Sequence, residues 1–151
     1  MVPPGRGNSF NVSVGADFRG RAYKGDTLLH SVVQREEEAP EIIKYLVSLG
    51  LDVNARNDPG NTPLHLAARD DESVKVLESL VAAGADVNAK NNKGETPIHD
   101  SARENKNVEI TKFLVAKGAG VDAKDNAGLT PFNKATDNLN TAVIEYLDTL
   151  P

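Results

Sequence analysis

The chain of 151 residues has no cysteine and no tryptophan, and its only aromatic residues are three tyrosines and four phenylalanines. Without cysteine it has neither a disulfide framework nor a thiolate metal site. So few aromatic side chains argue against a platform on which nucleic-acid bases would stack. No uninterrupted apolar run approaches the ~20 residues that cross a bilayer as a helix, so membrane insertion is not expected.

A basic surface and enzyme signature motifs are also missing. Acidic residues outnumber basic ones by 22 to 17, and the resulting net charge of −5 argues against general nucleic-acid binding. No apolar segment of the secretory type follows Met1, so a cytoplasmic location is expected. The chain has no phosphate-binding loop and no Gly-x-Ser-x-Gly nucleophile motif. We therefore expect no catalytic residue, no cofactor and no nucleic-acid partner.

What the chain does contain is repetition. One phrase, close to Gly-x-Thr-Pro-Leu-His, occurs four times, at residues 25–30, 60–65, 94–99 and 128–133. Successive copies begin 35, 34 and 34 residues apart. A ten-residue phrase recurs in step with it, at residues 46–55, 80–89 and 114–123. Self-similarity at such a period is typical of a solenoid, whose usual function is recognition by an extended surface.

The repeated pattern resembles the ankyrin repeat family: Gly-x-Thr-Pro-Leu-His-x-Ala-Ala, a helix, then Leu-Val-x-x-Gly-Ala-Asp-Val-Asn-Ala. The resemblance implies β-hairpin fingers, each followed by two antiparallel helices. We expect an all-α repeat solenoid of about four repeats over residues 15–151, after a flexible or extended tail at 1–14. The expected repeats are about 22–56, 57–90, 91–124 and a C-terminal capping repeat at 125–151.

Local chemistry agrees with this reading. Thr62-Pro63 suits a helix start, because threonine can cap and proline is tolerated at the first helical position. Gly84 stands where a left-handed helix cap needs glycine. Residues 141–150 are expected to form the last helix.

All three histidines, His30, His65 and His99, belong to the repeated phrase. The resemblance implies that each lies on a first helix and hydrogen-bonds within and between neighbouring fingers. Packed helices lie ~8–10 Å apart, whereas Zn–N bonds measure ~2.0–2.1 Å. Equivalent rings in adjacent repeats are therefore not expected to share a metal ion.

The resemblance implies a non-catalytic interaction module that binds a protein partner, and the chain is expected to be a monomer. Information about the partner lies at positions that the repeat leaves free, namely the finger tips and the concave face of the first helices. The tip candidates are Asp58, Asn61, Asn92, Lys93, Glu95 and Leu129. The candidates on the first helices are Arg69, Asp70, Asp100, Arg103, Glu104 and Lys134.

Two questions stay open at this stage. Arg69 and Arg103 occupy equivalent positions, so they either line a groove for a partner or form local bridges, such as Arg103 to Asp100. Asp100 and Lys134 are also equivalent to each other and predict a cross-repeat ion pair; they either form one polar patch with Arg69 and Arg103 for a partner or are simply exposed there, the pair adding ~0–1 kcal/mol.

The alternative function is a passive spacer, or a substrate of asparagine hydroxylation within a larger assembly. Asn54 and Asn88 stand in Asp-Val-Asn-Ala arms that resemble such sites. A structural role for these asparagines, holding the arm through side-chain to backbone hydrogen bonds, competes with that reading.

Overall fold

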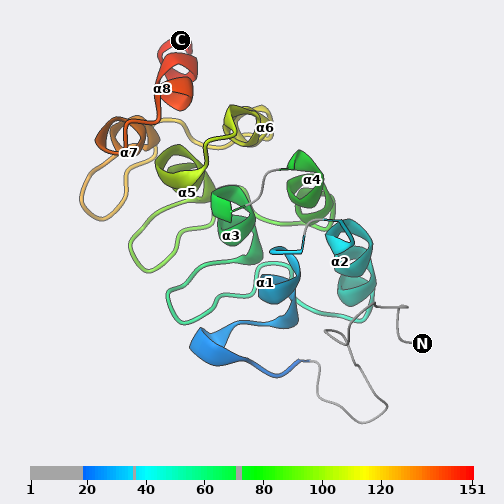
Figure 1. The fold of residues 1–151 in the computed structure, drawn as a ribbon. Helices are drawn as coiled ribbons and strands as arrows, with labels where there is room; N and C mark the ends of the chain where they lie inside the picture. Colours follow the sequence, from blue (N-terminus) through cyan, green and yellow to red (C-terminus); the bar gives the residue numbers. More distant parts are fainter. Residues whose placement is uncertain (1–18, 36, 71–72) are drawn as a thin grey trace.

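The computed structural model describes residues 19–35, 37–70 and 73–151, and these form eight α-helices and one 3₁₀ turn. The expected tail at 1–14, and the expected start of the repeat domain at residue 15, lie outside the described residues. The α-helices follow one another in antiparallel pairs that make four repeats (Figure 1). The 3₁₀ turn η1 spans Tyr23–Gly25, and the helices are α1 Leu28–Val32, α2 Ala39–Ser48, α3 Pro63–Asp70, α4 Val74–Ala82, α5 Pro97–Glu104, α6 Val108–Ala116, α7 Pro131–Asp137 and α8 Thr141–Asp148.

The helices form two rows, and the helices within one row pack more closely than those within the other. The first helices of the inner repeats, α3, α5 and α7, pack more extensively on one another than the second helices α4, α6 and α8 do. The array therefore curves with the first helices on its concave side. The fingers project from the same side as this inner row (Figure 1).

The repeated phrase starts each first helix as expected. Thr96 and Thr130 are N-caps whose side chains accept from the backbone of the first turn, and a proline follows each of them. The second helices begin on polar caps of a different kind, because the side chains of Ser73 and Asn107 each accept a backbone N–H two residues on. Gly84 has φ +100° beyond the end of α4, which confirms its role as a left-handed cap.

The expected fingers are present, although the described residues include no strand. Each finger is a tight turn closed by two backbone hydrogen bonds, such as Asn57 N–H to the carbonyl of Asn61 at 3.0 Å and Gly60 N–H to the carbonyl of Asn57 at 2.9 Å. Its backbone groups pair sideways with neighbouring fingers, as in the 3.0 Å bond from Asn92 N–H to the Pro59 carbonyl.

The core runs continuously between the two rows of helices. Leucines and isoleucines of both helices in a repeat are fully buried in it, among them Leu64, Leu77, Leu80, Ile98 and Leu114. The last repeat adds a smaller apolar cluster with Val143 and Leu147. Because each repeat supplies only one layer of this core, its first helix is held in place by the neighbouring repeats.

Candidate functional site

The ring of His65 connects its repeat to the next. The backbone N–H of Thr62 donates to Nδ1 at 3.1 Å, and Nε2 lies 3.0 Å from the carbonyl oxygen of Glu95. Because a backbone N–H only donates, Nδ1 is unprotonated and Nε2 carries the proton. Burial lowers the pKa of His65 from 6.5 to about 4, which keeps the ring neutral.

The same contact recurs in the flanking repeats. His30 Nε2 lies 2.8 Å from the carbonyl oxygen of Asn61, and His99 Nε2 lies 3.0 Å from that of Leu129. Burial also lowers the pKa of His30 and of His99. These contacts confirm the structural role that the resemblance implied. In the fourth repeat Asn133 takes the histidine position and closes the same N-terminal cap.

The arms that follow the second helices are tied together by asparagine. Asn54 Nδ2 donates to the Gly84 carbonyl at 3.1 Å, and its Oδ1 accepts the N–H of Asp86 at 2.8 Å. Asn88 makes the equivalent pair of bonds one repeat later, to the backbone of Gly118 and Gly120. Both amides therefore bridge repeats, as the structural reading of these residues expected.

The concave face centres on Arg103, whose guanidinium holds three carboxylates at once. Nη1 donates to Glu95 at 2.6 Å, Nη2 to Asp100 at 2.7 Å and Nε to Glu104 at 2.9 Å. The Arg103 side chain is 23% exposed, while those of Glu95 and Asp100 are almost fully buried. The expected local bridge from Arg103 to Asp100 is therefore present.

Lys134 lies close by with partners that the sequence did not indicate. Its Nζ is 2.9 Å from Glu95 and 2.8 Å from Asp125, and both carboxylates are buried. The predicted Asp100–Lys134 ion pair is wrong. Lys134 instead bridges two fingers, because the two carboxylates at their bases converge on its ammonium group.

The equivalent interfaces between the first three fingers explain why residue 134 is a lysine. Asn57 Nδ2 donates to the side chain of Asp26 at 2.8 Å, and Asn91 Nδ2 to that of Asn61 at 2.9 Å. At the next interface the equivalent residues are Asp125 and Glu95, which are both acceptors. Without a donor between them these two carboxylates would repel, and the ammonium of Lys134 supplies the missing donor.

The charges of this network alter its acid–base behaviour. Burial would raise the pKa of Asp125, but hydrogen bonds from Lys134 and from two backbone N–H groups outweigh it and lower the pKa to about 2. Asp100 behaves in the opposite way, because burial raises its pKa to about 7 despite the nearby Arg103. Asp100 is thus the buried acid of the concave face that most favours the protonated form.

Arg69 also pairs with carboxylates, as Arg103 does, but its side chain is slightly more exposed. It grips Asp70 with two hydrogen bonds of 2.8 Å, and its Nε lies 4.0 Å from Glu104 of the next repeat. The Arg69 side chain is 28% exposed and that of Glu104 47% exposed. Arg69, Asp70, Arg103 and Glu104 together form the row of charges that we call the concave charge row.

Two candidate residues do not lie where the sequence placed them. Glu95 is 2% exposed and Asp100 is 3% exposed, so neither carboxylate reaches a free surface. Both are drawn inward by Arg103. Among the other tip candidates, Asp58, Asn92 and Lys93 are exposed, whereas Asn61 and Leu129 are half-buried because the fingers stack on their neighbours.

Asp125 is the network residue that the sequence reasoning missed. It is the counterpart of Asn57 and Asn91 at the base of each finger, where the side chain accepts backbone N–H groups of its own turn. The signal was the recurrence of Asn or Asp at this position, with a change from amide to acid in the fourth repeat.

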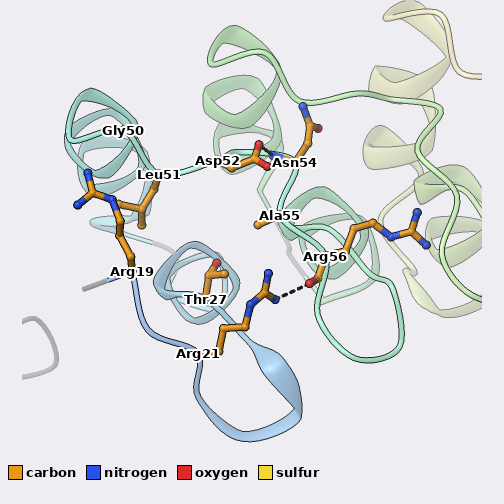
Figure 2. A pocket seen from close by; sticks show the side chains of 9 residues that line it. All are labelled: Arg19, Arg21, Thr27, Gly50, Leu51, Asp52, Asn54, Ala55 and Arg56. Carbon is orange, nitrogen blue, oxygen red and sulfur yellow. Dashed lines mark hydrogen bonds between the residues drawn. The ribbon is translucent and has the colours of Figure 1, made fainter. Parts of the chain in front are cut away.

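A hollow of about 440 Å³ lies between the segment before α1, with Arg19 and Arg21, and residues 50–56, which follow α2 in the same repeat (Figure 2). Two arginines at its edge are occupied by backbone oxygens: Arg19 donates to Leu49 at 2.9 Å and Arg21 to Arg56 at 2.6 Å. The Arg56 side chain points away from the hollow (Figure 2) and donates to Asn92 at 3.3 Å. The first two contacts hold the segment before α1 against the end of the same repeat, and the third reaches the finger that contains Asn92.

The described residues hold neither a metal-binding cluster nor a membrane-spanning helix. The described part of the chain holds no group of three or more histidine and carboxylate side chains placed to bind a metal ion. None of the helices in the described ranges is long and apolar enough to cross a membrane.

Known proteins share this repeat pattern. The sequence model described as ankyrin repeats (3 copies) matches residues 8–91 and 71–148. A segment of 43 residues is 42% identical to an ankyrin repeat protein of Fowlpox virus (strain NVSL). That segment covers 28% of this chain and 9% of the viral protein, so the match spans less than a tenth of that relative's length.

Proposed function

The chain belongs to the ankyrin repeat family, whose domains are generally protein–protein interaction modules and typically non-catalytic, and we propose that it binds a protein partner across its concave face. The contact surface consists of the concave charge row and the exposed finger tips at Asp58, Asn92 and Lys93. Lys134, which is 14% exposed, borders this surface.

One observation carries the proposal. Arg69 and Arg103 occupy equivalent positions on α3 and α5, each is held by carboxylates, and each keeps about a quarter of its side chain exposed. A guanidinium that is already fixed loses little conformational entropy when it binds. Arginine is also enriched among the residues that dominate binding energy, and it recognises carboxylates and aromatic faces.

The buried carboxylates of Glu95 and Asp100 hold Arg103 in position below the proposed contact surface. Glu95 and Asp100 fix two nitrogens of Arg103, so they act by positioning and do not touch the partner themselves. Asn61 and Leu129 serve the stacking of the fingers through their carbonyl oxygens, which accept from histidine. The contact set is therefore narrower than the twelve positions that the sequence suggested.

The alternative is a passive spacer or a hydroxylation substrate. No observation favours it specifically, since each of the amides of Asn54 and Asn88 already makes two bonds between repeats. Intact-mass analysis of material from the source cell tests it directly, because hydroxylation adds one oxygen atom.

The test of the concave face compares two charge-matched double variants. Arg69→Ala with Glu104→Ala removes one cation and one anion from the charge row. Lys112→Ala with Glu109→Ala removes the same charges from an exposed pair on α6, 2.9 Å apart. The melting temperature of each variant is first shown to equal that of the native chain. The native chain and both variants are then used for affinity capture of proteins from lysate of the source cell.

We expect a protein that the native chain and the α6 variant both retain and the charge-row variant loses. If both variants retain that protein equally, the charge row is not the binding surface. If the native chain retains no protein at all, the interaction proposal fails and the spacer reading takes its place.

A further inference from the structure

Of the three buried carboxylates in the network around Arg103 and Lys134, Asp100 has the fewest hydrogen-bond donors. Its Oδ1 accepts from Arg103 Nη2 at 2.7 Å, and no donor from the described residues reaches Oδ2. The residue is only 3% exposed, so solvent has little access to the second oxygen. A buried carboxylate with a single donor is poorly compensated in its ionised form.

The other two buried carboxylates are better supplied. Glu95 accepts from Arg103 at 2.6 Å and from the Asn91 amide at 3.3 Å. Lys134 Nζ lies 2.9 Å from Glu95 and 2.8 Å from Asp125. Asp125 also accepts two backbone N–H groups of its own turn, both at 2.9 Å. Asp100 is therefore the carboxylate of this network that gains most from a proton.

The charges packed around Asp100 do not remove this deficit. The elements in contact with α5 present Arg69 and Asp70 on α3, Lys134 on α7, Glu95 on the adjoining finger and the exposed pair Glu109 and Lys112 on α6. Arg69 is already bonded to Asp70, and Lys134 to Glu95. On α5 itself, Glu104 adds a third carboxylate to the guanidinium of Arg103.

The acid–base behaviour of Asp100 agrees with this geometry. Burial raises its pKa to about 7, although the positive charge of Arg103 acts in the opposite direction. Asp100 therefore exchanges its proton near neutral pH.

Protonation changes what holds Arg103. Nη2 then faces a neutral acid, and hydrogen bonds between charged groups are about twice as strong as neutral ones. The bonds from Nε to Glu104 and from Nη1 to Glu95 remain, so the plane of the guanidinium stays fixed. The Arg103 side chain is 23% exposed, so the change reaches the concave surface.

We propose that a proton on the Asp100 carboxyl controls how Arg103 is presented on the concave face. In the ionised form three carboxylates occupy the guanidinium, and in the protonated form two do. The consequence for a partner rests on the proposed function: a carboxylate of the partner takes the place of Asp100 at Nη2 once Asp100 is protonated.

The free chain tests the proposal without any partner. The full chain, labelled with ¹³C and ¹⁵N, is titrated between pH 5 and pH 8.5. The side-chain carboxyl carbon of Asp100 and the Nε–Hε resonance of Arg103 are followed in the same samples. We expect both to shift with one midpoint near pH 7. The Nε–Hε resonance of Arg69, which is bonded to Asp70, should move much less.

Two amide substitutions provide matched controls. Asp100→Asn and Glu104→Gln each remove the charge of one carboxylate that is bonded to Arg103, at a buried and at an exposed position. The pH-dependent shift of Arg103 should vanish in Asp100→Asn and persist in Glu104→Gln. The ring carbons of His99, whose pKa is lowered by burial, are recorded in the same spectra to separate its titration from that of Asp100.

The proposal is overturned if the Asp100 carbon titrates with a midpoint below pH 6, or if the Arg103 resonance does not follow it. Persistence of the Arg103 shift in Asp100→Asn would overturn it as well. If that variant does not fold, the native titration with Arg69 as reference still decides. All of these results come from the free chain, so they are independent of whether the concave face binds a protein.

Discussion

His65 and Glu95 are joined across a repeat boundary by a bond that involves the main chain of one and the ring of the other. Nε2 of the histidine lies 3.0 Å from the carbonyl oxygen of Glu95, whose own carboxylate turns to Arg103 at 2.6 Å. One residue thus serves both the stacking of the fingers and the fixing of the concave face. Changes in repeat packing are therefore expected to reach the concave face that we propose as the binding surface.

The pH dependence of stability follows from two opposing groups. The His65 pKa of about 4 is below its unfolded value of about 6.5, so its stabilising contribution is complete above pH 6.5 and is lost as pH falls toward 4. The amount is about 3 kcal/mol for such a shift. Asp100, with its pKa raised to about 7, acts in the opposite direction, because the native state favours its proton and loses stability as pH rises from about 4 to 7.

Asp100→Asn removes the opposing group. We expect the free energy of unfolding of this variant to fall more steeply than that of the native chain between pH 7 and pH 5, by on the order of 1 kcal/mol. Urea titrations of both proteins at the two pH values measure the difference. An equal or shallower fall in the variant would show that Asp100 is ionised throughout this range.

Core truncation tests the one-dimensional stacking of the repeats. Leu80→Ala leaves a cavity at a fully buried site in an inner repeat and should cost about 2–5 kcal/mol. Leu147→Ala, in the last repeat, should cost less because its side chain is already 9% exposed and has neighbours on one side only. Thermal and denaturant unfolding give both values. A larger loss for Leu147→Ala would contradict the stacking picture.

The arm asparagines offer a comparison between equivalent positions. Asn54→Ala deletes two bonds between repeats and should cost about 1–3 kcal/mol of stability. Asp122→Ala changes the corresponding residue of the third repeat, whose side chain bonds to none of the described residues, and should be close to neutral. Equal unfolding free energies for the two variants would mean that the Asn54 bonds add nothing to stability.

Two glycines with positive φ separate backbone strain from crowding. Gly84→Ala and Gly94→Ala both place a side chain in the left-handed region, at a cost of about 1–2 kcal/mol. The new methyl of Gly94→Ala would also lie 2.9 Å from the backbone nitrogen of Asn126, whereas that of Gly84→Ala meets nothing within 4 Å. We expect Gly94→Ala to lose about 1–3 kcal/mol more. A smaller loss than that of Gly84→Ala would show that the finger of Asn126 moves away from residue 94 at little energetic cost.

Much of the fold was predictable because its determinants are local. The Thr-Pro start of α5, the glycine cap at Gly84 and the apolar positions of the second helices each act within a few residues and recur at a fixed period. The expected fingers are tight turns without strands in the described residues, and they also pair with their neighbours. Such sideways pairing joins residues about 34 positions apart, which a local pattern does not reveal.

The candidate site was predictable in outline only. Equivalence of position correctly placed Arg69 and Arg103 on one face, since residues one period apart lie side by side in a stack. It did not show that Glu95 and Asp100 are buried, because their exposure depends on where a long arginine side chain settles among several carboxylates.

The sequence by itself determined the repeat, its period and the helices, because each follows from a motif repeated at fixed spacing. The roles of the histidines followed from the resemblance to ankyrin repeats. Only the tertiary structure decided which charges meet. Lys134 bridges Glu95 and Asp125 and not Asp100, because stacking brings the bases of two fingers together at its ammonium group. Such a choice among competing partners depends on distances of a few ångströms and on burial, and both arise only when the repeats pack.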